Sequence, residues 1–277
     1  MSLVFTTTSC DMDLTPDSAV PEHEALRTID DCDAWVVGIY SAFKNSALYS
    51  GYMTLLPDIQ ADMAYAALNT NNGFYTNIYQ WDIKSTTDEI IAVYNGLYTI
   101  VARCNFFLDY KDQVEVNLKT TADKDNFKKR LGEVYFARAM AYAELIRLFC
   151  EPMTSVNADT ENMGICLPTT YRDDVPKVKR STLRESYNQI ISDLKSAEDN
   201  LPDSRTVADS HYFSKGAVYA LRARIYMYMG MGDLKRDRNN EYLKKSVEAA
   251  TKVIKLGVYE LSDAINNAFV IDSKYYT

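Results

Sequence analysis

The chain has 277 residues, 47% of them hydrophobic, and a formal net charge of −8 at pH 7. This length and apolar content can fill a complete hydrophobic core, and the acidic balance without a basic stripe argues against a nucleic-acid partner. With only seven Pro and ten Gly between long runs of helical periodicity, we expect an all-α protein. No stretch reaches the roughly 18 consecutive apolar residues of a membrane-spanning helix.

The first ten residues form a short apolar run that ends in a cysteine. This run, MSLVFTTTSC, is similar to the tail of a lipoprotein signal whose front is missing, which makes Cys10 a candidate for lipidation. A disordered leader with a chance cysteine explains the same residues equally well. We expect residues 1–27 to be a signal remnant and tether, and residues 28–277 to be one helical domain.

Helical periodicity and end signals predict the elements of that domain in chain order. We expect amphipathic helices separated by polar connections. Residues 65–81 are expected to be a long loop or a pair of short elements, and 151–180 a long connection. The predicted helical segments are 30–44, a short apolar piece at 55–64, 86–107, 125–149, 182–202, 214–230 and 240–257.

Several of these helices carry recognisable start signals. Thr86-x-x-Glu89 and Thr182-x-x-Glu185 both have the spacing of a capping box, in which two side chains satisfy free backbone N–H groups. Ser214 has the character of an N-cap for the helix that follows it. These signals place three helix starts directly from the sequence.

An internal repeat indicates how the helices stack. The segment GEVYFARAMAY (132–142) recurs as GAVYALRARIY (216–226), with six identities at an offset of 84. Such a repeat predicts tetratricopeptide-like helical hairpins, pairing 86–107 with 125–149 and 182–202 with 214–230, so that the helix from residue 240 begins a third pair.

The side chains of the repeat are expected to be structural. The tyrosines recur at helical spacing, which favours core packing over ligand binding. Arg138 and Arg222 occupy equivalent positions. They could clasp a ligand carboxylate, but we expect them to tie one hairpin to the next or to reach carbonyls at a helix end. The tyrosines concerned are Tyr135, Tyr142, Tyr219, Tyr226 and Tyr228.

Several segments in series resemble the SusD/RagB family. They are SCDMDL, VYNGLYTIVARCN, GEVYFARAMAYAELIRLF, VPKVKRSTLRESYNQIISDLKSAEDNLP, SKGAVYALRARIYMYMG and GVYEL. The resemblance implies a SusD-like α-α superhelix of tetratricopeptide-like pairs, with the C-terminal half of the family fold missing from this chain. It also implies a surface-exposed outer-membrane lipoprotein that captures an oligosaccharide or related nutrient. A SusC-like TonB-dependent transporter is the implied partner, and the outer membrane is the implied location.

Residues 65–81 combine aromatic and amide side chains in the way that a sugar binder requires. Aromatic rings stack on the C–H faces of a sugar, and amides bond to its hydroxyls. An alternative is that the aromatics only fasten a long loop to the helices, and Trp81 in particular can belong to the core. The predicted ligand-binding residues are Asn71, Asn72, Phe74, Tyr75, Tyr79 and Trp81.

The sequence points away from catalysis. It contains no nucleophile elbow, no phosphate-binding glycine loop and no zinc-protease motif, so we expect no catalytic residue and no cofactor. His23 and His211 lie far apart without a ligand pattern, so no metal site is expected. The cysteines other than Cys10 are expected to be thiols in or near the core. A tetratricopeptide adaptor that holds a partner peptide is the alternative function.

Overall fold

The computed structural model describes residues 21–66, 73–171, 179–206, 208–232 and 238–259. Apart from one isolated bridge between Cys166 and Arg180, these residues form helices and their connections, which confirms the all-α prediction. A 3-10 turn, η1 (Glu22–Glu24), comes first. The α-helices are α1 (Ile29–Phe43), α2 (Tyr52–Gln60), α3 (Thr76–Tyr79), α4 (Asp88–Glu115), α5 (Thr121–Phe149), α6 (Leu183–Asn200), α7 (Lys215–Met231) and α8 (Asn240–Lys255).

The three predicted helix starts differ in how well they match the structure. The second capping box is confirmed, because Thr182 Oγ1 accepts from the N–H of Glu185 at 3.1 Å and Glu185 Oε2 accepts from the N–H of Thr182 at 2.8 Å. The first is wrong. α4 begins after Thr87, whose hydroxyl accepts from the N–H of Lys84 at 3.0 Å instead of capping the helix.

Ser214 does precede α7, as predicted, but its hydroxyl makes no cap. It lies 2.9 Å from the hydroxyl of Tyr259, a residue beyond α8. Two capping boxes escaped sequence analysis, because Asp takes the place of the usual Glu: Thr28 with Asp31 on α1, and Thr120 with Asp123 on α5.

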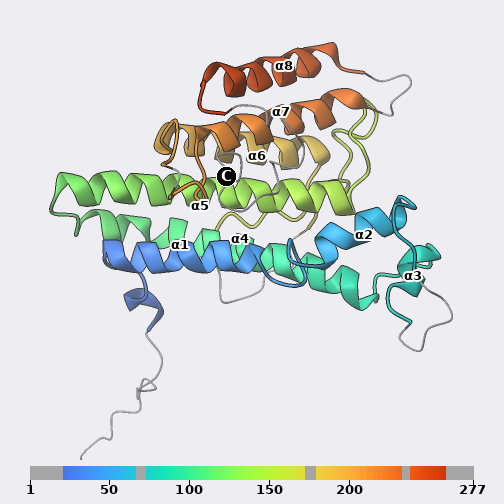
Figure 1. Ribbon diagram of the computed structural model, residues 1–277, viewed down its shortest axis with the longest axis horizontal. Helices are drawn as coiled ribbons and strands as arrows, with labels where there is room; N and C mark the ends of the chain where they lie inside the picture. The colour runs from blue at the N-terminus through green and yellow to red at the C-terminus, as the bar shows by residue number, and fades with distance from the viewer. Residues whose placement is uncertain (1–20, 67–72, 172–178, 207, 233–237, 260–277) are drawn as a thin grey trace, which may run out of the picture.

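The long helices stack side by side, from α1 and α4 through α5, α6 and α7 to α8 (Figure 1). α5 lies at the centre and packs against α1, α4 and α6. The short helices α2 and α3 lie at one end of this stack, and η1 lies at the other (Figure 1). The N-terminal part of the domain and the predicted ligand segment are therefore at opposite ends.

The observed helix pairs are shifted by one helix along the chain relative to the predicted pairs. α4 packs along α5 as expected, but α6 packs mainly on α5, and α7 packs mainly on α8. α8 is thus the partner of α7 and does not begin a new pair.

The two repeat glycines explain this pairing. A Cβ on Gly132 would lie 2.8 Å from Leu201, just past α6, and one on Gly216 would lie 2.4 Å from Tyr259, just past α8. Each glycine therefore makes room for the chain that leaves the following helix. The repeating units are α5 with α6, and α7 with α8.

α4 has the length and hydropathy of a candidate membrane span, with a mean hydropathy of 1.2 over 18 residues. It packs against α1 and α5, and residues such as Leu97, Ile100 and Phe107 on it are fully buried within the domain. A helix in the core of a domain can be as long and as apolar as a membrane span. The place of α4 in the stack therefore explains its composition.

A buried ion pair joins the central helices. The guanidinium of Arg138 on α5 donates from Nε and Nη2 to the two carboxylate oxygens of Asp193 on α6, at 2.8 and 2.7 Å. It also donates to Asn105 on α4 at 2.8 Å. Burial raises the pKa of the Asp193 carboxyl, and the hydrogen bonds and charge of Arg138 oppose that rise. Arg138 was predicted to tie one hairpin to the next. With the observed pairing, its bonds to Asp193 lie within the α5–α6 unit, and only its bond to Asn105 reaches another helix, α4.

Replacing Arg138 by Met should lower the free energy of unfolding by about 3–5 kcal/mol, because it leaves a buried carboxylate without its partner. Urea unfolding followed by circular dichroism measures this. Arg184 is a matched control, since it holds Asp159 in the same two-pronged geometry at 2.6 and 2.9 Å on the surface. Arg184→Met should leave the unfolding midpoint unchanged within error. Equal losses in the two variants would contradict the prediction.

Candidate functional site

The predicted ligand segment is built on α2 and α3, which pack against each other at one end of the stack. Ile78, only 1% exposed, anchors α3 in the core. Of the predicted residues, Phe74, Tyr75, Tyr79 and Trp81 belong to the part of the chain that the structure describes. Asn71 and Asn72 lie outside the described residues, as does Cys10.

The four aromatic residues separate into two groups. Tyr75 and Tyr79 are half-buried against the core, and Tyr75 meets Tyr52 of α2 edge-on with ring centroids 6.1 Å apart. These two rings fasten the segment to the core. Phe74 is 68% exposed and Trp81 is 64% exposed, so their rings are available to a ligand. The role of all four in binding stays a prediction.

Trp81 is exposed because of the way α3 ends. Its N–H donates to the carbonyl of Ile78 at 3.1 Å, and the next N–H, of Asp82, donates to the carbonyl of Asn77 at 2.9 Å. These two bonds form a Schellman motif, whose C′ residue adopts a left-handed conformation. Trp81 occupies that position with φ = 57°, where glycine is the usual residue.

α2 ends in the same way. The N–H of Asp62 donates to the carbonyl of Ile59 at 3.3 Å, and that of Met63 donates to the carbonyl of Asp58 at 2.9 Å. Asp62 is the C′ residue, with φ = 58°. Two turns of one type therefore close the two short helices, and each places side chains at the surface.

Backbone strain is concentrated in this region. Asp62, Tyr75 and Trp81 are three of the four non-glycine residues with positive φ in the described chain; the fourth is Asn162. A bulky side chain in this conformation costs on the order of 1 kcal/mol or more, and such costs gather where a side chain must be aimed for function. The exposed indole of Trp81 recovers little of that cost by packing.

Sequence analysis missed one further aromatic residue at this end. Tyr65 follows α2 closely and is 79% exposed, and it is preceded by the exposed Met63. Both belong to the connection that leaves the Schellman turn of α2. A binder that uses Phe74 and Trp81 has Tyr65 as a third ring on the neighbouring helix end.

Trp81→Gly should be more stable than Trp81→Ala by about 1 kcal/mol, because only glycine adopts the left-handed conformation without strain. Trp81→Gly should also be no less stable than the wild type, since the indole contributes little packing. Thermal and urea unfolding of the three proteins measure both differences. If Trp81→Gly unfolds well below the wild type, the ring is a packing residue and not a free platform.

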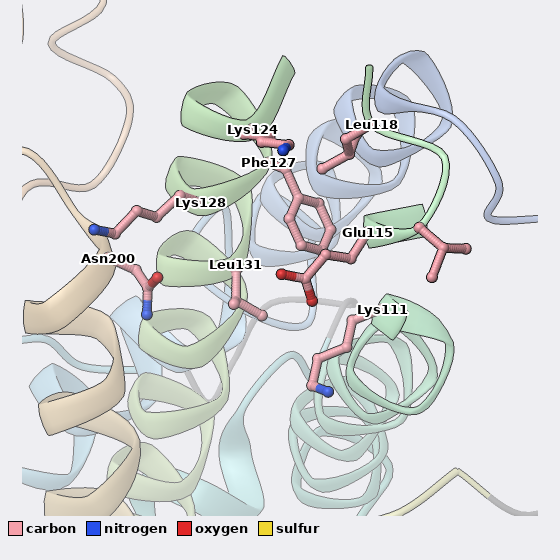
Figure 2. Close-up of a pocket in the computed structure, with 9 residues that line it drawn as sticks. Lys111, Glu115, Leu118, Lys124, Phe127, Lys128, Leu131 and Asn200 are labelled. Atoms are coloured by element: carbon pink, nitrogen blue, oxygen red, sulfur yellow. The ribbon is translucent and has the colours of Figure 1, made fainter. Parts of the chain in front are cut away.

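A hollow of about 530 Å³ lies elsewhere, where the C-terminal end of α4 meets the first half of α5 (Figure 2). Lys111 and Glu115 come from α4, whereas Phe127 and Leu131 come from α5 (Figure 2). At 1.5 Å per residue, α4 alone separates Lys111 from Asp88 by about 35 Å. Among the described residues, neither Phe74, Tyr75, Tyr79 nor Trp81 lines this hollow.

Comparison with known proteins identifies the family. A family model described as "Starch-binding associating with outer membrane", SusD-like, matches residues 12–227. The chain belongs to the SusD-like family. It is 22% identical to the SusD-like protein P2 of Formosa agariphila over 230 residues. This alignment covers 82% of the present chain and 42% of that protein.

Solved structures share the fold. A SusD homolog from Bacteroides thetaiotaomicron superposes with a TM-score of 0.71 at 22% identity, covering 87% of this chain and 43% of that one. A laminarin-binding SusD-like protein gives a TM-score of 0.59 at 18% identity, covering 82% and 44%. The chain thus spans less than half the length of these SusD-like relatives.

Proposed function

We propose that this SusD-like protein captures an oligosaccharide at the cell surface through the exposed aromatic residues that flank α2 and α3, without chemical change to the ligand. The observation that carries the proposal is the indole of Trp81, held at the surface in a strained helix-end conformation that glycine would adopt more easily. Phe74, ahead of the same short helix, is exposed, and so is Tyr65, which follows α2. Together they offer flat apolar faces of the kind on which sugar rings stack.

The proposal extends to the route of the ligand. Cys10 would carry the lipid anchor, and a SusC-like TonB-dependent transporter would receive the captured oligosaccharide. The placement of the described ends supports an exposed site. Glu22 is bonded to Tyr110 near the end of α4 at 2.9 Å, while Trp81 precedes the start of α4. A chain tethered ahead of Glu22 would present the aromatic residues at the end away from the tether.

Binding is tested by calorimetry with starch-derived and laminarin-derived oligosaccharides, the two ligand classes that the comparisons suggest. Trp81→Ala combined with Phe74→Ala should weaken binding about tenfold or more, since two exposed rings are lost while the core is kept. Val116→Ala, an exposed apolar residue at the far end of α4, is the control and should bind as the wild type does. Unchanged affinity in the double variant would remove these rings from the site.

Anchoring is tested in cells of a bacterium that lipidates outer-membrane proteins. With a labelled fatty acid and a complete lipoprotein signal restored ahead of the printed sequence, the protein should retain label and the Cys10→Ala variant should lose it, because the thioether to the lipid forms at that sulfur. A Cys32→Ala variant, which changes a buried thiol, should keep the label. Absence of label from the wild type would favour the adaptor function over the lipoprotein.

A further inference from the structure

The hollow between α4 and α5 exists because α6 does not extend along the whole of α5. Arg138 of α5 pairs with Asp193 of α6, and a Cβ on Gly132 would lie 3.0 Å from Asn200, the last residue of α6. The two helices are therefore antiparallel, and residues 121–131 of α5 lie beyond the end of α6. One face of this free part of α5, formed at helical spacing by residues 124, 127, 128 and 131, lines the hollow.

The lining of the hollow combines apolar and basic side chains. Phe127 and Leu118 are only 5% and 9% exposed and supply buried apolar surface, to which the half-buried Leu131 adds. Lys124 and Lys128 lie one turn apart on α5, and both are exposed. With a volume of about 530 Å³, the hollow has the size of a small-ligand site.

The acids beside the hollow leave two of its lysines without a partner. Lys111 bonds to the carboxylate of Asp112, and this bond and the charge of Glu115 raise the pKa of the Lys111 ammonium. Glu115 is the only acid among the described residues that line the hollow, and its carboxylate lies toward Lys111 (Figure 2). Lys124 and Lys128 form no ion pair within the described part of the chain.

This region is basic in a protein that is acidic as a whole. From Lys111 to Leu131 the sequence holds six basic and four acidic residues, whereas the chain carries a net charge of −8. Asp123 is engaged in the capping box of α5. An anionic partner is therefore attracted to this end of the domain more than to the rest of its surface.

The N-terminal tether leaves from the same end of the stack. The side chain of Gln113 donates to the carbonyl of Leu26 at 2.6 Å, and that of Asn117 donates to the carbonyl of Arg27 at 3.3 Å. The chain ahead of α1 thus follows the last turns of α4, which also line the hollow (Figure 2). The twelve residues that begin at Cys10 and precede η1 reach at most about 40 Å.

We propose that the hollow and its lysines dock on the phosphate groups of membrane lipids beside the anchor. The inference rests on the lipid anchor of the proposed function and adds the orientation of the domain. A tether fixes only a distance, whereas a second contact at the hollow holds the opposite end, with Phe74 and Trp81, away from the bilayer. Lysines near an anionic lipid surface are attracted to it, and apolar side chains among them enter the headgroup region. Val116, which lines the hollow and is 82% exposed, is such a side chain.

The test is cosedimentation of the full chain, without lipid on Cys10, with vesicles of equal parts phosphatidylglycerol and phosphatidylcholine. In 50 mM salt the protein should bind these vesicles at least tenfold more tightly than vesicles of phosphatidylcholine alone, and 0.5 M salt should remove most of the difference. Because the chain is acidic overall, it is attracted to an anionic vesicle only if a local basic surface faces the lipid.

Two double variants assign the binding to residues. Lys124→Gln combined with Lys128→Gln should weaken binding to the anionic vesicles about tenfold or more, and circular dichroism checks that the helices are kept. Lys244→Gln combined with Lys255→Gln removes the same charge from exposed lysines of α8, on the far side of the stack from α4, and should leave binding unchanged (Figure 1).

Each contrary outcome overturns the docking surface. Equal binding to the two kinds of vesicle shows that charge plays no part, and equal losses in the two double variants show that the hollow is not the contact. Release by 10 mM inorganic phosphate, but not by chloride at the same ionic strength, assigns the hollow to free phosphate. Fatty-acid labelling at Cys10 reports on the anchor separately, so failure of the anchor and failure of the docking surface are distinguished.

Discussion

The buried pair of Arg138 and Asp193 is the constraint on which the stack depends. A guanidinium and a carboxylate inside a helical core are tolerable only when nearly all their hydrogen bonds are made. Asn105 satisfies part of this need from α4, and its amide in turn donates to the carbonyl of Pro168 at 2.7 Å. Three helices and the loop between α5 and α6 are thereby fixed to one another by a single group.

The long helices were predictable because their signals are local. Apolar spacing and end residues located six of them, and the repeat around Gly132 and Gly216 identified stacked hairpins. The pairing was not predictable in the same way. Which neighbour a helix chooses depends on where a missing Cβ admits another chain, and the partners Leu201 and Tyr259 lie far from their glycines in sequence.

The candidate site was predictable in composition but not in geometry. Aromatic and amide residues predicted a sugar-binding segment at 65–81, but the sequence suggested Trp81 as the ring that could belong to the core. In the structure Tyr79 packs against the core and Trp81 is exposed. The difference comes from the end of α3, where Trp81 fills a position that sequence patterns associate with glycine.

The repeat glycines also explain how the two units tolerate connections of very different length. Residues 150–182 join α5 to α6, whereas 232–239 join α7 to α8. A connection about four times as long adds only about 1.2 kcal/mol of closure entropy. Since Gly132 receives Leu201 beyond α6, the contact that closes the unit does not involve the connection at all. The stack can therefore accept connections of different length between paired helices while each pair stays in register.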